Sequence, residues 1–134
     1  MTDGELITQL IAAYGPAVDS GDAEAAAALF TEDGWYDVAG GRLEGRSAIA
    51  DMVRGDAHQS LLRRGVAHVM GLPRVTVAGD RAVAVNHTTV YLEGRVWRVA
   101  ANRWELVRTA DGWRVSGRTN RLLDGSPEAR DLLR

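Results

Sequence analysis

The sequence predicts an α+β fold, with helices packed on one face of a curved antiparallel β-sheet. In the first half of the chain, apolar residues recur at the spacing that lines one face of a helix. In the second half, apolar and polar residues alternate in four long segments, as in strands with one buried face. Short Gly-containing links join these segments and suit β-hairpins. Helices that precede a run of strands gather on one side of the sheet.

Three helices are expected before the long strands. Residues 3–18 carry an amphipathic pattern, and Gly15-Pro16 should reset its last turn because proline lacks the N–H donor. Asp22 is a good N-cap for the Ala-rich run 23–29, because its side chain can accept from a free backbone N–H. Ser47 is expected to cap the third helix in the same way.

The strands are expected between glycine-rich turns. Residues 31–34 are predicted to form a turn and residues 58–64 a polar loop. The predicted strands, two short and four long, are 35–38, 42–45, 66–77, 82–92, 96–108 and 112–121, followed by a terminal helix at 128–134. The sequence contains no repeat and no linker-like segment, which predicts one domain over residues 1–134.

Charge and hydropathy exclude several classes of partner. The 134 residues have a formal net charge of −2, which gives no broad basic surface for nucleic acid. No apolar run approaches the roughly 20 residues of a membrane span, and the start lacks the pattern of a signal peptide. We therefore expect a cytoplasmic protein that binds neither nucleic acid nor membranes.

The absence of two residue types limits the chemistry. The chain has no Cys, which excludes thiolate nucleophiles, and all 16 basic residues are Arg, which excludes a Schiff-base lysine. Acid–base chemistry then depends on His58, His68 and His87, the carboxylates and three Tyr. A metal site built from His68, His87 and a carboxylate is conceivable, but its spacing matches no motif, so we expect no metal and no cofactor.

Several segments match one known family. They are AVDSGD (17–22), ALFTEDG (28–34), LEGR (43–46), AHV (67–69), WELVR (104–108) and DGWRV (111–115). With these, the chain resembles the SnoaL-like branch of the nuclear transport factor 2-like superfamily over nearly its whole length. The resemblance implies a cone, in which three N-terminal helices pack on the concave face of a curved antiparallel sheet around a pocket. It also implies a homodimer, formed through the outer face of the sheet. This superfamily includes enzymes, binding proteins and structural subunits.

Within that superfamily, scytalone dehydratase and hexachlorocyclohexane dehydrochlorinase are the nearest chemical parallels. Both pair an Asp at the end of the first helix with a His that opens the first long strand, and Asp19 and His68 occupy those places. Such a carboxylate fixes the tautomer of the imidazole and leaves its other nitrogen as a base. Taken alone, Asp19 also fits a helix-terminal turn residue, and His68 a strand residue with a backbone partner.

Other residues are candidates for substrate binding. The resemblance matches Asn102 to a pocket Asn of the dehydratase. Val38 occupies the position at which the dehydratase has a pocket Tyr. Tyr36 lies two residues earlier in the same predicted strand, so its side chain should point to the same side as that of Val38. The dehydratase also has a second catalytic His near Glu93, where this chain has none. The remaining expected wall residues are Met70, Tyr91, Trp104 and Leu106. His87 fits either the pocket or a subunit contact, and the Arg residues after position 94, including Arg118, are expected on the outer face.

The leading functional hypothesis is a cofactor-independent lyase or isomerase. It would act on a small cyclic or polyketide-like molecule, with His68 as base and Asn102 and Tyr36 as hydrogen-bond donors to the substrate oxygen. Two alternatives remain open. One is a non-catalytic protein that binds a small hydrophobic ligand, and the other is a structural subunit that resembles the β subunit of a ring-hydroxylating dioxygenase.

Overall fold

A curved seven-stranded sheet organises the computed structural model, which describes residues 1–134. The strands are β1 (Phe30–Val38), β2 (Gly41–Glu44), β3 (Val66–Met70), β4 (Arg74–Ala78), β5 (Arg81–Leu92), β6 (Arg95–Thr109) and β7 (Gly112–Leu122). The helices are α1 (Asp3–Ala12), α2 (Tyr14–Asp19), α3 (Ala23–Ala28), α4 (Gly45–Arg54), α5 (Asp56–Arg64) and α6 (Pro127–Asp131). None of them has the length and hydropathy that a membrane span requires.

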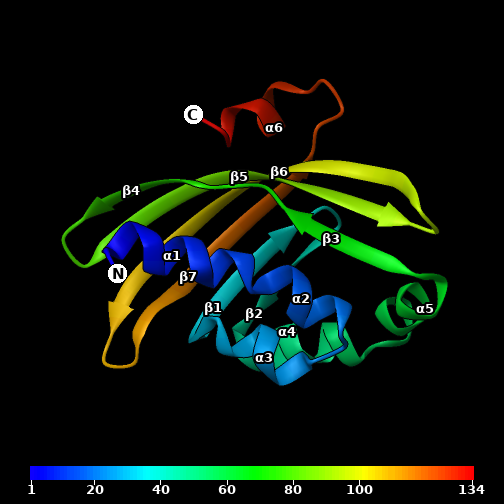
Figure 1. The fold of residues 1–134 in the computed structure, drawn as a ribbon, viewed down its shortest axis with the longest axis horizontal. Helices are drawn as coiled ribbons and strands as arrows, with labels where there is room; N and C mark the ends of the chain where they lie inside the picture. The colour runs from blue at the N-terminus through cyan, green and yellow to red at the C-terminus, as the bar shows by residue number, and fades with distance from the viewer.

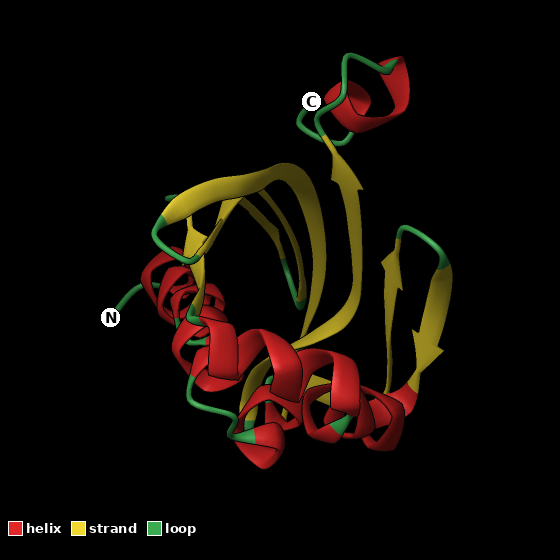
Figure 2. Ribbon diagram, turned by 90° about the vertical axis from the view of Figure 1, so that its right-hand side faces the viewer, coloured by secondary structure: helices red, strands yellow, loops and turns green.

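The predicted α+β class and cone are confirmed. The strand order is β2-β1-β7-β6-β5-β3, with β4 also paired to β5, and α1 to α5 lie on the concave side of this sheet (Figure 1). Helix α6 lies on the opposite, convex side (Figure 2). The sheet is not wholly antiparallel, because β1 pairs with β7 in parallel. This pairing is possible because several helices and strands separate β1 from β7 and let the chain return in the same direction.

The N-terminal helices follow the sequence signals closely. Helix α1 begins with a capping box in which Thr2 and Glu5 bond each other's backbone N–H. The helical pattern breaks at Ala13, and Pro16 then falls in the first turn of α2, where its missing N–H costs no hydrogen bond. Asp22 caps α3 as predicted, since its carboxylate accepts from the N–H of Ala25 at 3.0 Å.

Three local predictions are wrong. Residues 58–64 belong to helix α5, which ends at Gly65 in the left-handed conformation. Residues 31–34 are part of β1, although the pairing of β1 with β7 is irregular between Phe30 and Trp35. Helix α4 begins at Gly45 with Glu44 as its N-cap, so Ser47 lies inside the first turn.

The predicted strand 66–77 is two strands, β3 and β4, separated at residues 71–73. Gly71 and Pro73 explain the break, because proline lacks an N–H for the ladder. The N–H of Gly71 still donates to the carbonyl of His87 at 2.7 Å. Both strands therefore remain attached to β5, and β3 forms the edge that faces α2 and α5.

A bulge in β7 changes which side chains face the cavity. The pairing of β7 with β6 shifts between Val115 and Gly117, so Ser116 is an extra residue. Before the bulge, Trp113 and Val115 point inward, and after it Arg118 does. The expectation that Arg118 lies on the outer face is therefore wrong. Gly117 is required here, because a Cβ would lie 2.1 Å from the Trp35 ring.

Candidate functional site

A cavity of about 240 Å³ lies between the concave face of the sheet and the helices. Ten of its sixteen lining residues are hydrophobic, so the cavity suits an apolar molecule. Polar groups reach it from α5, β3, β5, β6 and β7. They are His58, His68, Thr88, Arg98, Arg118 and Asn120.

Asp19 and His68 meet at the wall of this cavity. Asp19 is the last residue of α2, and His68 lies in the middle of the edge strand β3. The ring Nδ1 of His68 is 2.6 Å from Oδ1 of Asp19, and the backbone N–H of His68 donates to Oδ2 at 2.7 Å. Both carboxylate oxygens of Asp19 therefore form hydrogen bonds with His68. The two side chains are only about a fifth exposed, at 22% and 20%.

The partner of Nδ1 determines the chemistry of the His68 ring. A carboxylate accepts hydrogen bonds, so Nδ1 carries the proton and Nε2 of the neutral ring has a free lone pair. An imidazole in this tautomer can accept a proton at Nε2. The imidazolium that results is stabilised by the Asp19 carboxylate. The structure thus brings the two predicted residues into direct hydrogen-bond contact.

Gly15 makes this meeting possible. A Cβ at Gly15 would lie 2.3 Å from the carbonyl oxygen of His68. Helix α2 therefore lies directly against β3, which brings the end of the helix to the side chain of His68. The signal was present in the sequence as a glycine inside a helical pattern, which is unfavourable without a packing reason.

A second imidazole lies beside the cavity. His58 is buried in α5, and its Nε2 is 2.6 Å from the carbonyl oxygen of Val18. Because a carbonyl only accepts, Nε2 carries the proton. The rings of His58 and His68 are 6.1 Å apart between centroids. Sequence reasoning placed His58 in a loop and missed its place in the site, because the helical pattern of α5 is mostly polar.

Arg118 is a second cavity residue that sequence reasoning placed wrongly. It is 1% exposed and lines the cavity. Its guanidinium carbon lies 4.4 Å, 4.5 Å and 4.3 Å from the ring centroids of Tyr14, Tyr36 and Trp104. Each distance is within the range of a cation–π contact. Burial, reinforced by the nearby Tyr36, raises the pKa of Tyr14, and Arg118 only partly opposes this rise.

Asn102 lies behind Arg118 rather than at the cavity surface. Its Oδ1 accepts from Nε and Nη2 of Arg118, at 3.1 and 2.9 Å, and from Nδ2 of Asn120 at 2.7 Å. Its own amide donates to Oγ1 of Thr88 at 2.6 Å. Its side-chain oxygen is therefore fully occupied by protein donors, and one of its two amide N–H groups has a protein acceptor. The predicted inward phase of Asn102, Trp104 and Leu106 is correct, but all three lie outside the cavity lining.

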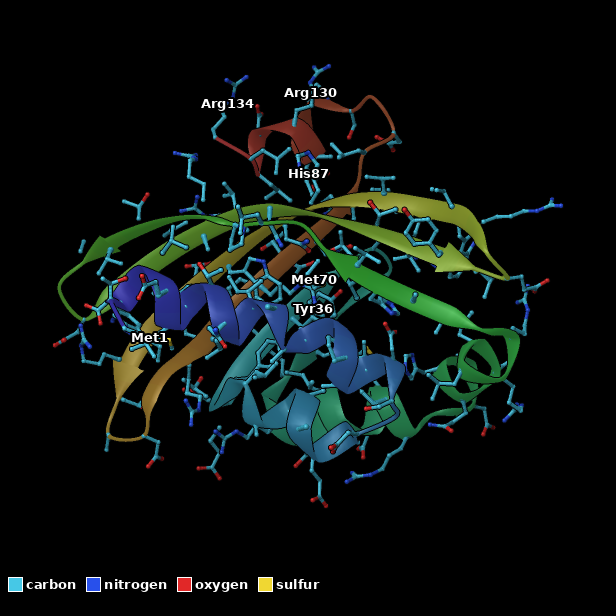
Figure 3. The ribbon with its side chains drawn as sticks, in the orientation of Figure 1. Met1, Tyr36, Met70, His87, Arg130 and Arg134 are labelled. Carbon is cyan, nitrogen blue, oxygen red and sulfur yellow. The ribbon has the colours of Figure 1, made fainter.

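Three of the predicted site residues line the cavity: His68, Tyr36 and Val38. Met70 packs against Gly15 and accepts from Thr88, and it does not reach the cavity. Figure 3 shows Tyr36 and Met70 between the sheet and the helices, whereas His87 lies across the sheet, toward α6.

The strand phase explains why Tyr91 and His87 are exposed. In β5, the buried residues include Ala82, Ala84, Asn86, Thr88 and Val90, the opposite phase to His87 and Tyr91. The buried polar residues in this phase have internal partners. For example, Asn86 Oδ1 accepts from the Trp104 indole at 2.8 Å. No group of three His, Asp or Glu side chains comes together in a metal-binding arrangement.

Comparisons with known proteins agree with this architecture. Residues 1–119 match the family model described as a SnoaL-like domain. The structure superposes with a TM-score of 0.95 on an NTF2-like protein with a cystatin-like fold from Novosphingobium aromaticivorans. The two are 49% identical, and the alignment covers 98% of this chain and 89% of that one. No curated protein matches the chain at a significant level.

More distant solved structures share the same fold. A Mycobacterium tuberculosis protein of unknown function is 26% identical, with a TM-score of 0.79 over 91% of this chain and 73% of that one. Aln2 from a Streptomyces species is 24% identical, with a TM-score of 0.77 over 88% of each chain. The shared fold supports small-molecule binding or cofactor-free isomerisation. The family match and the close superposition show that the chain belongs to the SnoaL-like domain family, within the nuclear transport factor 2-like superfamily.

Proposed function

We propose that this protein is a cofactor-independent lyase or isomerase that moves a proton on a small cyclic or polyketide-like molecule. The observation that carries the proposal is the 2.6 Å contact between His68 Nδ1 and Asp19 Oδ1 at the wall of an apolar cavity. A structural subunit needs neither this pair nor a cavity lined by buried polar groups.

The proposed step is abstraction of a proton from a carbon next to a carbonyl group. Nε2 of His68 takes the proton, and the electron pair of the C–H bond moves onto the carbonyl oxygen as an enolate. In an isomerisation, the substrate carries a C=C bond conjugated with the enolate, so His68 returns the proton to the far carbon of this dienolate and the double bond shifts. In an elimination, the enolate expels a leaving group from the β carbon, which forms a double bond, and the imidazolium later loses its proton to solvent.

Groups around the cavity support this step. The Asp19 carboxylate stabilises the imidazolium, and the hydroxyl of Tyr36 is a donor for the developing oxyanion. The largely apolar lining excludes water and so strengthens both interactions. Asn102 does not line the cavity, and we assign it the role of holding Arg118 in place.

The test follows proton abstraction directly, without knowledge of the natural substrate. The probe is 2-tetralone, and its α-proton exchange with D₂O is followed by ¹H NMR above the uncatalysed background. We expect wild-type protein to accelerate exchange and His68→Gln to lose about 10²- to 10⁴-fold of the acceleration. Asp19→Asn should also slow exchange, because it no longer fixes the tautomer of His68.

His87→Gln is the matched control, because it makes the same change on the convex side of the sheet. This variant should exchange 2-tetralone at the wild-type rate. Undiminished exchange by His68→Gln would exclude the proposal. Binding of 2-tetralone by wild-type protein with no acceleration would instead support the alternative of a non-catalytic ligand-binding protein.

A further inference from the structure

Arg118 has one group that no part of the protein satisfies. Nη1 is the only buried side-chain nitrogen or oxygen without a hydrogen-bond partner. The Tyr14 hydroxyl lies close to the guanidinium but forms no hydrogen bond of good geometry with it. Native proteins satisfy the great majority of buried polar groups, so an exception calls for a physical explanation.

The guanidinium also lacks a counterion. The structure contains ten ion pairs that join Arg or His to a carboxylate, and none of them includes Arg118. Its only polar partner is the neutral side-chain oxygen of Asn102. A buried charge without a counterion is costly in free energy.

A purely structural role explains only part of this arrangement. The three aromatic rings and Asn102 offset part of the cost of burying the cation, through cation–π contacts and two hydrogen bonds. They leave the donors of Nη1 unsatisfied. They also do not explain why the cation forms part of a cavity wall, where an apolar side chain of similar length fills the same space at lower cost.

We propose that the ligand of this cavity is a small apolar molecule that carries a carboxylate, and that the carboxylate binds Nη1 of Arg118. This inference deepens the proposed function, because it names the class of substrate that the same cavity takes. A carboxylate supplies both the missing acceptor and the missing counterion, and its hydrogen bond to a guanidinium is charge-assisted and therefore strong. The apolar lining then receives the rest of the molecule.

Two features hold Arg118 ready for this contact. Asn102 fixes Nε and Nη2, so Nη1 is the end of the guanidinium that is left for a ligand. The rings of Tyr14 and Tyr36 cover the guanidinium, and both also line the cavity. Nη1 has less than 1 Å² of accessible surface, so the carboxylate reaches it by a small displacement of these tyrosine side chains.

The test compares a carboxylate with its neutral isostere by calorimetry. We expect wild-type protein to bind 2-naphthoate about 10- to 100-fold more tightly than 2-naphthamide, the range that a hydrogen bond to a charged group provides. Arg118→Met should remove this preference. Arg98→Met is the matched control, because Arg98 also borders the cavity but is exposed and stacked on Trp97, with 3.8 Å between guanidinium and ring. This control should keep the preference.

Equal binding of the two compounds by wild-type protein would overturn the inference, as would a preference that survives in Arg118→Met or disappears in Arg98→Met. A second measurement needs no variant. Arg118 is the only fully buried arginine, so its Nε–H should resist solvent exchange in ¹⁵N-arginine-labelled protein. This resonance should shift with 2-naphthoate and not with 2-naphthamide. Both readouts are independent of turnover, so they can fail while the deuterium exchange of 2-tetralone succeeds, and the reverse.

Discussion

At the scale of single residues, the side-chain oxygen of Asn102 accepts three hydrogen bonds. Nε and Nη2 of Arg118 and the amide of Asn120 all donate to Oδ1. Asn102→Leu keeps a similar volume but leaves these donors without an acceptor inside the protein. We expect this change to lower the free energy of unfolding by about 3–5 kcal/mol, measured by urea denaturation, as for other buried charges that lose a partner.

The double variant separates a specific contact from a general packing loss. Asn102→Leu leaves the buried charge of Arg118 without an acceptor, and Arg118→Met removes that charge. The double variant should therefore lose less free energy of unfolding than the sum of the two single variants, by about 1–3 kcal/mol. Strict additivity of the two unfolding free energies would show that Asn102 does not act through Arg118. Arg98→Met combined with Asn102→Leu is the control pair, because Arg98 does not contact Asn102, and it should be additive.

The hydroxyl of Tyr14 gives a prediction about pH. Burial raises the pKa of Tyr14 above its ordinary value of 10.0, so the folded protein keeps this proton where the unfolded chain releases it. The contribution to stability is complete below pH 10 and is lost as pH rises above that value, by up to about 1.4 kcal/mol per pH unit. Tyr14→Phe should therefore flatten the decline of stability between pH 10 and 11, in urea titrations at several pH values. An unchanged slope in Tyr14→Phe would contradict this prediction.

At the scale of elements, the contact between α2 and β3 positions the dyad. Glycine inside a helix normally costs stability, so Gly→Ala in a helix is expected to stabilise by up to about 1 kcal/mol. At Gly15 the added Cβ meets the carbonyl oxygen of His68 at 2.3 Å and must displace α2. We expect Gly15→Ala to destabilise the fold by about 1–3 kcal/mol and to slow the 2-tetralone exchange, because Asp19 moves with the helix.

Gly4→Ala in α1 is the matched control for this prediction. A Cβ at Gly4 has Thr2 Oγ1 as its nearest neighbour at 3.9 Å, so the change should be neutral or slightly stabilising, with normal exchange activity. A higher melting temperature in Gly15→Ala would contradict the prediction. It would show that the close approach of α2 to β3 does not constrain the site.

Elements with a strong local pattern were predictable from the sequence, and those set by tertiary contacts were not. The strands β5, β6 and β7 were predicted to within one residue at each end, because their alternation is long and their turns contain glycine. The inward position of Arg118 depends on a single extra residue, Ser116, and a bulge leaves no mark in an alternating pattern. Helix α5 was missed because its polar sequence buries only His58.

The same distinction applies to the candidate site. Asp19 and His68 were paired through a family resemblance, and their contact depends on the close packing of α2 against β3 that Gly15 allows. The prediction of Tyr91 at the pocket wall is wrong, because the inward side of β5 carries Asn86 and Thr88, which have partners inside the protein. Alternation alone cannot separate a satisfied polar residue from an exposed one.

At the scale of the whole molecule, the sheet forms one continuous wall of the cavity and the helices form the other. The wall made by α5 is the weakest part, since His58 is its only buried side chain, although Ala57 and Leu61 also border the cavity. Helix α1 is of similar length but is held by a capping box and by Asp3, which accepts from Arg108 and Trp113. Local opening should therefore begin at α5.

Hydrogen exchange measured by mass spectrometry tests this order of opening. We expect the amides of α5 to exchange faster than those of α1 and of β6, with Leu61→Ala increasing the difference because it removes part of the packing of α5 over the cavity. A ligand that fills the cavity should slow exchange in α5 and leave α1 unchanged, because α5 lines the cavity and α1 does not. If α5 exchanged as slowly as β6, this helix would be a fixed wall of the cavity and not the first part of the fold to open.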